Sequence, residues 1–402
     1  MKTFQLGSLI TISKGKKHTI SEVPSSQSTR MLGIDDLRND TLIRLTDDKN
    51  GVLACDEDVL IAWDGANAGT IGFGKQGYIG STISRLRLHD TSKFYAPFIG
   101  MFLQSNFSYL RKTSTGATIP HINRNALESI PVPVFEYDDQ IRIATLLSKV
   151  ENLISRRREQ LKRLDELLKS VFLDMFGDPV RNEMGWEKKQ IAEIGCVKIG
   201  PFGSLLHASD YISNGIPLIN PSHIVNGEIQ PDYSLTITSK KFDELTSYHL
   251  SENDIVVARR GEIGRCALVR DNSKLLCGTG SMFIRIESEY VPDLLQFQIF
   301  TTSLKDLLVS KAKGVTMKNL NSTTLETLQV ICPPIDLQNQ FAAIIKKVEC
   351  IKSSYQQSLT ELENLYGILS QKAFKGELDL SQVLCAQVSD DVKRMVSGIC
   401  VI

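Results

Sequence analysis

The sequence lacks the features expected of a membrane protein, a secreted protein or a zinc-dependent domain. No run of about 18 apolar residues occurs in its 402 residues, so we expect no membrane span. Polar Ser13–Lys17 follows the N-terminus too closely to leave room for the apolar segment of a signal peptide. The eight cysteines form no C-x-x-C pair, which argues against a zinc site and suits free thiols in a reducing cytoplasm.

An excess of charge of either sign is also missing. Lysine and arginine together number 46, and aspartate and glutamate together also number 46. The chain therefore lacks the overall basic charge that would indicate a nucleic-acid partner. Any role in nucleic-acid binding has to be argued from local clusters.

One glycine-rich stretch imitates two nucleotide-binding motifs. Gly69–Gly77 contains a G-x-G-x-x-G pattern and nearly satisfies the P-loop pattern. Gln76, however, stands where a P-loop needs serine or threonine for magnesium, and Tyr78–Ser81 cannot sustain the helix that a dinucleotide fold requires. We interpret the stretch as a glycine-rich turn between strands.

Other catalytic signatures are missing as well. The chain has no [N/D]-P-P-[Y/F/W] methylation motif, no H-E-x-x-H and no G-x-S-x-G, and Pro231-Asp232 is not followed by the E-x-K of metal-dependent nucleases. We therefore predict no catalytic residue, no metal site and no cofactor in this chain, and expect a binding protein rather than an enzyme.

An internal duplication is the most informative feature present. When the chain is shifted by 198 residues, a long block matches itself without gaps. A period near 200 is far too long for a solenoid, so it indicates two copies of a whole module with divergent front parts and matched back parts. Matching pairs include Gly116 and Gly314, Asn123 and Asn321, Gln140 and Gln338, Lys149–Glu151 and Lys347–Glu349, and Phe176 and Phe374.

The back of each module has the periodicity of a long helix. Apolar residues recur at alternating steps of four and three, which is the heptad pattern of paired helices, and only Arg157 interrupts the first series. Each helix would span roughly 37 residues, or about 55 Å. The helices either pack on their own lobes or, as we favour, antiparallel against each other. The predicted pairing residues are Ile143, Leu147, Val150, Ile154, Leu161, Leu164, Leu168, Phe341, Ile345, Val348, Leu359 and Leu362.

The fold class predicted from these features is α+β. Short β-branched runs at 216–219, 254–258 and 282–286 indicate strands, and a helix is expected near 294–309. We expect two α/β lobes, 1–135 and 181–333, and two helical spacers, 136–180 and 334–380, arranged with pseudo-twofold symmetry. Residues 381–402 match nothing in the first copy and form a variable tail.

Local clusters of basic and amide residues beside glycines are the candidate DNA contacts. Lysine and arginine suit phosphates, while arginine, asparagine, serine and threonine can read base edges. Arg259, Arg260, Lys311 and Lys313 are the favoured positions. The full set is Lys14, Lys16, Lys17, Trp63, Asn67, Arg111, Lys112, Thr115, Lys198, Phe202, Ser204, Arg259, Arg260, Arg265, Lys311, Lys313 and Lys318.

Each cluster also has a structural interpretation. A group of like charges is often a solvated loop, and Gly116 and Gly314 are repeated residues that a junction with positive φ would require. Arg156–Arg158 on the first helix would then be exposed arginines paired with Glu151, Glu159 or a partner chain.

Taken together, the order lobe, helix, lobe, helix resembles the specificity subunit of type I restriction–modification systems. The likeness is carried by Gly200–Ser204, Asn214–Ile219, Asn253–Gly264 and Pro333–Ala342, together with the copy of the last segment at Gln140–Ala144. It extends over nearly the whole chain and ends near Leu380. In the first lobe, Thr11–Gly15 and Met31–Ile34 match only loosely.

The resemblance implies a division of labour between subunits. Each lobe would be a target-recognition domain that reads one half of a bipartite site in double-stranded DNA, and the helices would fix the gap. Two methyltransferase subunits carrying S-adenosylmethionine would dock on the helices, and a separate ATP-dependent restriction subunit would translocate and cut. Two alternatives stay open: a stand-alone or regulatory DNA-binding protein of the same fold, and a helical scaffold with no role on DNA.

Overall fold

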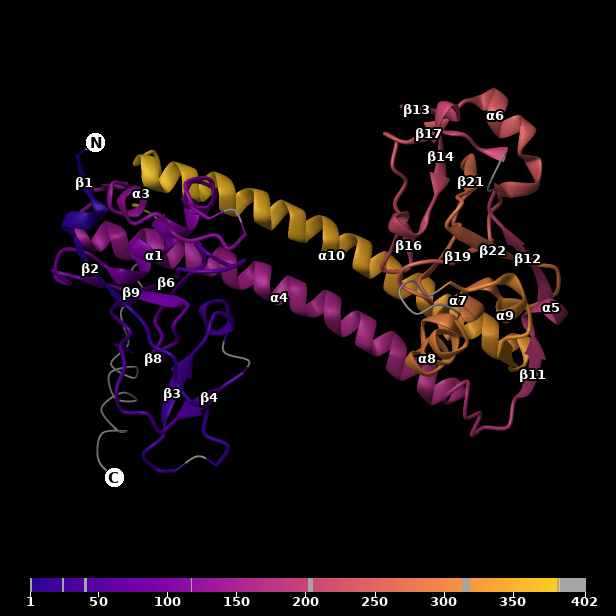
Figure 1. Ribbon diagram of the computed structural model, residues 1–402, viewed down its shortest axis with the longest axis horizontal. Coiled ribbons are helices and arrows are strands. Elements are labelled where there is room, and N and C mark those ends of the chain that lie inside the picture. The colour runs from indigo at the N-terminus through magenta and orange to yellow at the C-terminus, as the bar shows by residue number, and fades with distance from the viewer. Residues whose placement is uncertain are drawn as a thin grey trace. The chain divides into compact units, whose positions relative to one another are not determined.

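The computed structural model describes residues 2–23, 25–39, 42–116, 118–201, 205–312, 319–381 and 383. These residues form two compact units (Figure 1). Unit 1 runs to Arg158 and resumes at Gln357, and unit 2 comprises Glu159–Gln356. Compactness thus groups each lobe with the adjoining halves of the two long helices, so the segment boundaries at 135, 180, 333 and 380 stay a prediction.

The core of unit 1 is an antiparallel four-stranded sheet in the order β2–β9–β6–β7. Strand β6 is buried along its whole length because both faces of this sheet are covered: Val59 and Ile61 pack in the core beneath helix α1 (Figure 1), and Leu60 and Ala62 pack in a second core on the other face. The bounds are β2 Ile10–Lys14, β9 Ile83–Leu88, β6 Asp58–Ala62, β7 Ile71–Phe73 and α1 Ala96–Ser105.

A second sheet of unit 1 has the order β4–β3–β8–β5, with a parallel pairing between β3 and β8. A small core that contains Leu32 and Ile79 of this sheet and Leu60 of β6 joins it to the main sheet. The remaining bounds are β1 Thr3–Gln5, β3 Thr29–Leu32, β4 Arg44–Thr46, β5 Leu53–Ala54, β8 Gly77–Ile79, β10 Pro131–Pro133, α2 Phe107–Lys112 and α3 Arg124–Glu128, with β1 paired to β10.

Unit 2 repeats the main sheet in the order β12–β22–β19–β20, again antiparallel throughout. Its second sheet is larger, with the order β13–β17–β14–β21–β18. The main strands are β12 Gly195–Ile199, β22 Ser281–Ile286, β19 Ile255–Ala258 and β20 Cys266–Leu268. The second sheet comprises β13 Tyr211–Ile212, β17 Thr236–Ile237, β14 Ile216–Ile219, β21 Leu275–Cys277 and β18 His249–Leu250.

Two short pairs and five helices complete unit 2. The pairs are β11 Glu187–Gln190 with β23 Gln329–Cys332, and β15 Ile224–Val225 with β16 Glu228–Ile229. The helices are α5 Ile191–Ile194, α6 Ser239–Glu244, α7 Pro292–Phe300, α8 Thr302–Lys311 and α9 Ser322–Glu326.

The residues repeated in the sequence make repeated contacts. Gln140 is buried, and its side chain bonds the backbone of Tyr95, Lys93 and Phe135; Gln338 bonds Val291 and Pro333 in the same way. Asn123 and Asn321 likewise cap helices α3 and α9. Each unit also has an arginine paired with a buried carboxylate, Arg87 with Asp58 in unit 1 and Arg285 with Asp254 in unit 2. The duplication seen in the sequence is therefore also a duplication of the folded structure.

The long helices are α4, Tyr137–Phe176, and α10, Ile335–Lys375, slightly longer than the predicted 37 residues. In unit 1, Ile143 and Leu147 share a core with Ala373, so the start of α4 runs antiparallel to the end of α10. In unit 2, Leu168 shares a core with Phe341, so the end of α4 runs antiparallel to the start of α10. The helices therefore pack against each other and, at the same time, against the lobes.

Most of the residues predicted to pair the helices are buried, and three are partly exposed. The buried ones are Ile143, Leu147, Val150, Ile154, Leu168, Phe341, Ile345, Val348 and Leu359, and the partly exposed ones are Leu161, Leu164 and Leu362.

Ion pairs between the helices flank this contact. Arg158 pairs with Glu363 of α10 at 2.6 Å, and Lys352 pairs with Asp165 at 2.6 Å. Arg158 thus bonds a carboxylate of the neighbouring helix, while Glu159 bonds Arg163 of its own helix.

The strands predicted at 216–219, 254–258 and 282–286 are present within one residue. The single helix predicted at 294–309 is wrong, since α7 and α8 are separated by Thr301, whose backbone is extended. The Thr301 hydroxyl bonds the Gln298 carbonyl at 2.6 Å, which satisfies the end of α7 and turns the chain.

The glycine-rich stretch contains strand β7 and the turn that joins it to β8, in which Gly74 has φ +63°, so the prediction of a turn between strands holds only for residues 74–76. Gly77 has φ +145°, and a Cβ there would lie 2.4 Å from the Arg30 carbonyl oxygen of the adjoining strand. Close packing of the backbone therefore explains the glycine that completes the apparent nucleotide motif.

Candidate nucleic-acid interface

In unit 1 the candidate residues gather around the loop that joins β6 to β7. Trp63 begins this loop, and its backbone is fixed on both sides: its N–H donates to the Thr82 carbonyl at 2.7 Å, and its carbonyl accepts from Ile122 at 2.9 Å. Gly65 follows with φ +92° and open space around it. The loop is thus rigidly attached at its start and accessible at its bend.

Asp64 lies at the centre of this region. One carboxylate oxygen is 2.8 Å from the Lys14 ammonium, and the other is 2.6 Å from the His121 ring. Burial opposes ionisation of Asp64, but the hydrogen bonds from Lys14 and His121 outweigh it and lower the pKa of the carboxyl below its ordinary value. Asp64 is therefore an ionised acceptor, while Lys14 stays about half exposed.

Further candidates surround the same loop. Asn67 accepts from the Arg38 guanidinium at 2.8 Å, and Arg111 donates to the Ala66 carbonyl at 2.9 Å. Thr115 pairs through its backbone with His121. The structure therefore brings Lys14, Trp63, Asn67, Arg111 and Thr115 together.

A hollow of about 400 Å³ opens beside this cluster. Lys17 and Asn67 line it together with His18, Arg44 and the β8–β9 turn, so its wall is mainly polar. Two other predicted residues have less definite positions. The Lys16 N–H donates to the Ile79 carbonyl at 3.3 Å, and Lys112 is exposed in the last turn of α2.

Unit 2 repeats the backbone frame of this loop with other side chains. The Arg259 N–H donates to the Gly280 carbonyl at 3.0 Å, and its carbonyl accepts from Leu320 at 2.9 Å. Arg260 pairs with Asn319 as Asp64 pairs with His121. Gly261 has φ +77° and open space, as at Gly65. Arg259 and Arg260 therefore occupy the positions of Trp63 and Asp64.

Arg265 is bound within the protein. Its guanidinium donates to Glu262 at 2.6 Å and to the Pro221 carbonyl at 3.1 Å. Lys305 approaches the same carboxylate at 2.6 Å, and Lys305 and Arg265 together lower the pKa of Glu262 to about 2. The charge of Arg265 is thus compensated within the protein, and its predicted contact with DNA stays a prediction.

The other candidates of unit 2 are spread more widely. Lys198 is exposed on β12 opposite Phe283, and Lys311 is exposed in the last turn of α8. Phe202, Ser204, Lys313 and Lys318 lie outside the described residues.

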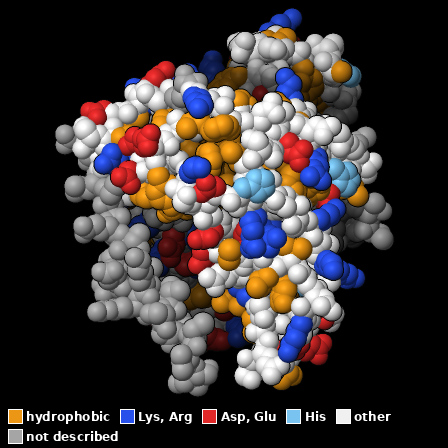
Figure 2. Space-filling model, turned by 90° about the vertical axis from the view of Figure 1, so that its left-hand side faces the viewer, with side chains coloured by type: hydrophobic (Ala, Val, Ile, Leu, Met, Phe, Trp, Pro, Cys, Tyr) orange, Lys and Arg blue, Asp and Glu red, His pale blue; other side chains and the backbone are white. Residues whose placement is uncertain are grey.

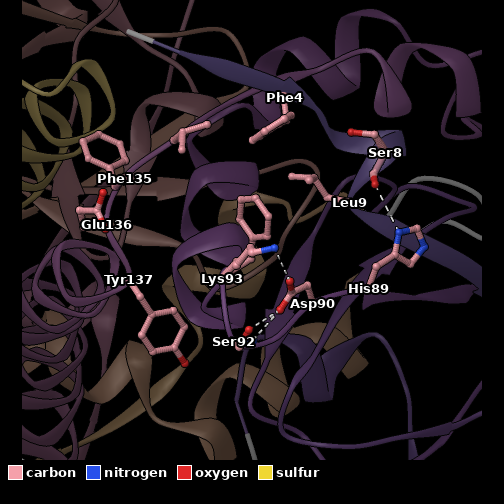
Figure 3. Close-up of a pocket in the computed structure, with 12 residues that line it drawn as sticks. Phe4, Ser8, Leu9, His89, Asp90, Ser92, Lys93, Phe135, Glu136 and Tyr137 are labelled. Carbon is pink, nitrogen blue, oxygen red and sulfur yellow. Dashed lines mark hydrogen bonds and ion pairs between the residues drawn. The ribbon is translucent and has the colours of Figure 1, made fainter.

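A second hollow, of about 470 Å³, lies elsewhere on unit 1 (Figure 3). Phe4, Leu9 and Tyr137 contribute its apolar wall, and Asp90 accepts there from Ser92 and Lys93. It adjoins the beginning of β2 and the end of β9, whereas Lys14 ends β2. The hollow and Lys14 therefore lie at opposite ends of strand β2, and none of the predicted DNA contacts lines the hollow.

Charges on the visible face of the molecule are mixed. In Figure 2 basic, acidic and hydrophobic side chains are interspersed, and the described residues form no continuous basic patch on this face. Within the described ranges, no three histidine, cysteine, aspartate or glutamate side chains gather in a way that suits a metal ion. None of the helices in the described part of the chain has both the length and the apolar character that crossing a membrane requires.

Sequence reasoning missed the acidic and neutral partners of the basic candidates. Asp64, His121 and Asn319 were absent from the predicted set although they organise the two loops. A signal was available: His121 faces Asn319 when the chain is shifted by 198 residues, and it is a difference inside an otherwise well-matched block.

Comparison with known proteins places these observations in a family. The type I restriction modification DNA specificity domain matches residues 1–163 and 183–364. The type I restriction enzyme MjaVIII specificity subunit of Methanocaldococcus jannaschii is 25% identical over 325 residues, covering 74% of this chain and 73% of that subunit. The EcoBI specificity subunit of Escherichia coli is 24% identical over 355 residues, covering 80% and 74%.

A solved structure shows the same fold. The S subunit of a type I restriction–modification system from M. genitalium has a TM-score of 0.57 at 15% identity, and the match covers 93% of this chain and 96% of that one. The duplicated α+β architecture agrees with this likeness, and the family match extends over both lobes and into both long helices. The chain belongs to the type I restriction modification DNA specificity family.

Proposed function

We propose that this chain is the non-catalytic specificity subunit of a type I restriction–modification complex, and that each lobe reads one half of a bipartite site in double-stranded DNA. One observation carries the proposal: the two lobes hold the same loop with the same backbone bonds but place Asp64 in one and Arg260 in the other. A shared frame with different side chains suits a site whose halves differ in sequence.

The helices would set the distance between the half-sites. DNA advances about 34–36 Å per turn, and helices of 40 and 41 residues are each about 60 Å long. Within each unit, buried residues of both helices share a core, which supports the proposed role of the helices as a spacer. This role follows from the resemblance and from the continuity of the two helices.

One flank of the helix pair has the character of a docking surface for partner subunits. Leu153 and Leu365 of unit 1 each immediately precede a residue of the helix–helix contact, and both are about half exposed, at 50% and 44%. Residues that precede the contact positions of an antiparallel pair lie on the same flank. Leu167 and Ile351 of unit 2 have the same positions and are 49% and 43% exposed.

The two leucine-rich flanks are copies of each other. Leu153 matches Ile351 and Leu167 matches Leu365 under the 198-residue shift. Ion pairs such as Arg158–Glu363 follow the contact on its other flank. An apolar flank that occurs once in each unit suits two copies of one partner, which we identify with two methyltransferase subunits. The ATP-dependent restriction subunit would join the complex separately.

Mapping of methylated adenines across a genome tests the proposed function. The comparison is between a host carrying this chain with its methyltransferase partner and the same host lacking this chain only. We expect a split motif with a fixed gap, and its disappearance when the chain is absent. Unchanged methylation would contradict the proposal and favour a stand-alone DNA-binding protein or a scaffold.

Docking is tested by exchanging leucine for aspartate on the apolar flank. The double variant Leu153→Asp and Leu365→Asp is expected to retain less methyltransferase subunit on co-purification than the unchanged chain. As the matched control, Leu153→Asp alone is compared with Ser155→Asp, which adds the same single charge at an exposed position that follows the contact on its other flank. Equal retention by both variants would contradict this docking surface.

A further inference from the structure

The two lobes differ most sharply at the second residue of the loop after their matching strands. In unit 1 this residue is Asp64, which is compensated by Lys14 and His121. In unit 2 it is Arg260, which faces Asn319 across the backbone pairing. At this position unit 1 therefore has a hydrogen-bond acceptor whose charge is compensated, and unit 2 has a positively charged hydrogen-bond donor.

We propose that this position determines base preference in each lobe, and that Arg260 recognises a guanine in the half-site read by unit 2. The inference rests on the proposed function and adds the residue and the chemical class of its target. In the major groove guanine presents the O6 and N7 acceptors, which match the two parallel donors of a guanidinium.

The surroundings of Arg260 fit this role. It is exposed, and its backbone is fixed by its pairing with Asn319 and by the two bonds of Arg259. Among the described residues no carboxylate forms an ion pair with Arg260, whereas Glu262 binds both Arg265 and Lys305. Gly261 leaves open space beside it. A cationic donor on a fixed, accessible backbone is thus available to a ligand.

The equivalent position of unit 1 has the opposite chemistry. The Asp64 carboxylate would repel the acceptors of guanine but can accept from the amino group of cytosine or adenine. Lys14 and His121 offset its charge, which reduces its repulsion of nearby phosphates. The same loop would therefore favour different bases in the two lobes.

A phosphate contact is the competing role for Arg260, and the two roles predict different results. Loss of a phosphate contact weakens binding to all sequences about equally. Loss of a guanine contact relaxes the requirement at one position and leaves the others unchanged. The readout therefore has to be the methylated sequence itself.

The test maps methylated adenines in hosts that carry the chain with its methyltransferase partner. The half-site of unit 2 is first identified by exchanging the other lobe, residues 1–135. Arg260→Gln is then expected to relax one guanine of that half-site, with a loss of discrimination on the order of 10- to 100-fold. Arg260→Lys, which keeps the charge but loses the paired donors, is expected to relax the same position. Lys274→Gln, another exposed cation of unit 2, is the charge control.

Each outcome decides the question. A relaxed guanine in one half-site, with an unchanged gap and other half, supports the inference. Uniformly weaker methylation of an unchanged motif, an unchanged motif at full strength, or a unit 2 half-site without guanine overturns it. If the unaltered chain directs no split motif at all, the proposed function fails instead. Circular dichroism of the variants confirms that the fold is retained.

Discussion

Replacement of Gln140 by leucine tests how the first lobe is joined to its helix. The Gln140 side chain is 1% exposed and makes three hydrogen bonds to backbone groups. Its carbonyl accepts from the Tyr95 N–H at 2.9 Å, and its amide donates to the carbonyls of Lys93 at 2.8 Å and Phe135 at 3.0 Å. Leucine has a similar volume but satisfies none of these groups.

The expected cost follows from which groups water can reach. All three bonds are part-buried, but Lys93 is an exposed residue whereas Tyr95 and Phe135 are half-buried, so we expect water to replace only the bond to the Lys93 carbonyl. A buried polar group without a partner costs about 1–3 kcal/mol. Two such groups, offset by the gain from a buried leucine, predict a loss of about 2–4 kcal/mol in the local free energy of opening.

Amide hydrogen exchange measures this loss where it occurs. We expect the amides around Tyr95 to exchange about 30- to 1,000-fold faster in Gln140→Leu, since 1.4 kcal/mol corresponds to a factor of ten. Gln338→Leu should produce a similar effect around Val291, whose N–H bonds Gln338 at 3.0 Å. Acceleration confined to one unit in each variant would show that the two copies act independently.

Gln104→Leu is the matched control. Gln104 is also part-buried, but it makes only a 3.3 Å bond to the Ile71 carbonyl, and its own carbonyl oxygen has no partner among the described residues. We expect this change to be close to neutral. If Gln104→Leu and Gln140→Leu accelerate exchange equally, hydrogen bonding by the repeated glutamine is not what joins the lobe to the helix.

Three further predictions address the spacer, the lobes and pH. Matched seven-residue insertions after Arg158 of α4 and after Gln356 of α10 add about 10 Å, so the methylated motif should keep both half-sites while its gap grows by about three base pairs; altered half-sites with an unchanged gap would refute the spacer. Exchange of residues 1–135 for the lobe of another family member should alter one half-site only, as read from the methylated motif. The Glu262 carboxylate, with its pKa lowered from 4.5 to about 2, contributes stability that is present above pH 4.5 and is lost as pH falls toward 2. The unfolding midpoint of Glu262→Gln should therefore approach that of the unchanged chain across this window, and a constant difference would contradict the role of the Lys305 contact.

The repeated residues were predictable because local rules and a shared contact coincide in them. Asn123 and Asn321 cap helices because each side chain accepts a hydrogen bond from the backbone N–H of the residue three positions later. This pattern depends only on nearby sequence. The heptad series likewise reflects the burial of Ile143 and Phe341 along one helix contact. Such features survive duplication because each copy must make the same bonds.

The candidate site was less predictable because its contacts are distant in sequence. Lys14 and Asp64 are joined across 50 residues, and Asp64 and His121 across 57. Only the pairing of strands and the position of the loop bring them together, and no local pattern contains that information. Thr301 was missed for a related reason: its bond to Gln298 interrupts a stretch whose composition is otherwise helical.

The neutral composition of the chain becomes understandable once the partners of its basic residues are known. Arg87 and Arg285 bind the buried carboxylates of Asp58 and Asp254, and Arg270 is held by Asp293 and Glu349. The charges of these arginines are compensated by carboxylates of the lobes and of the long helix α10. A count of basic residues therefore mixes structural arginines with those free to meet a ligand. The informative quantity for a DNA-reading lobe is the small number of cations that keep an exposed, uncompensated charge. Duplication allows the number and the positions of these cations to differ between two copies of one fold.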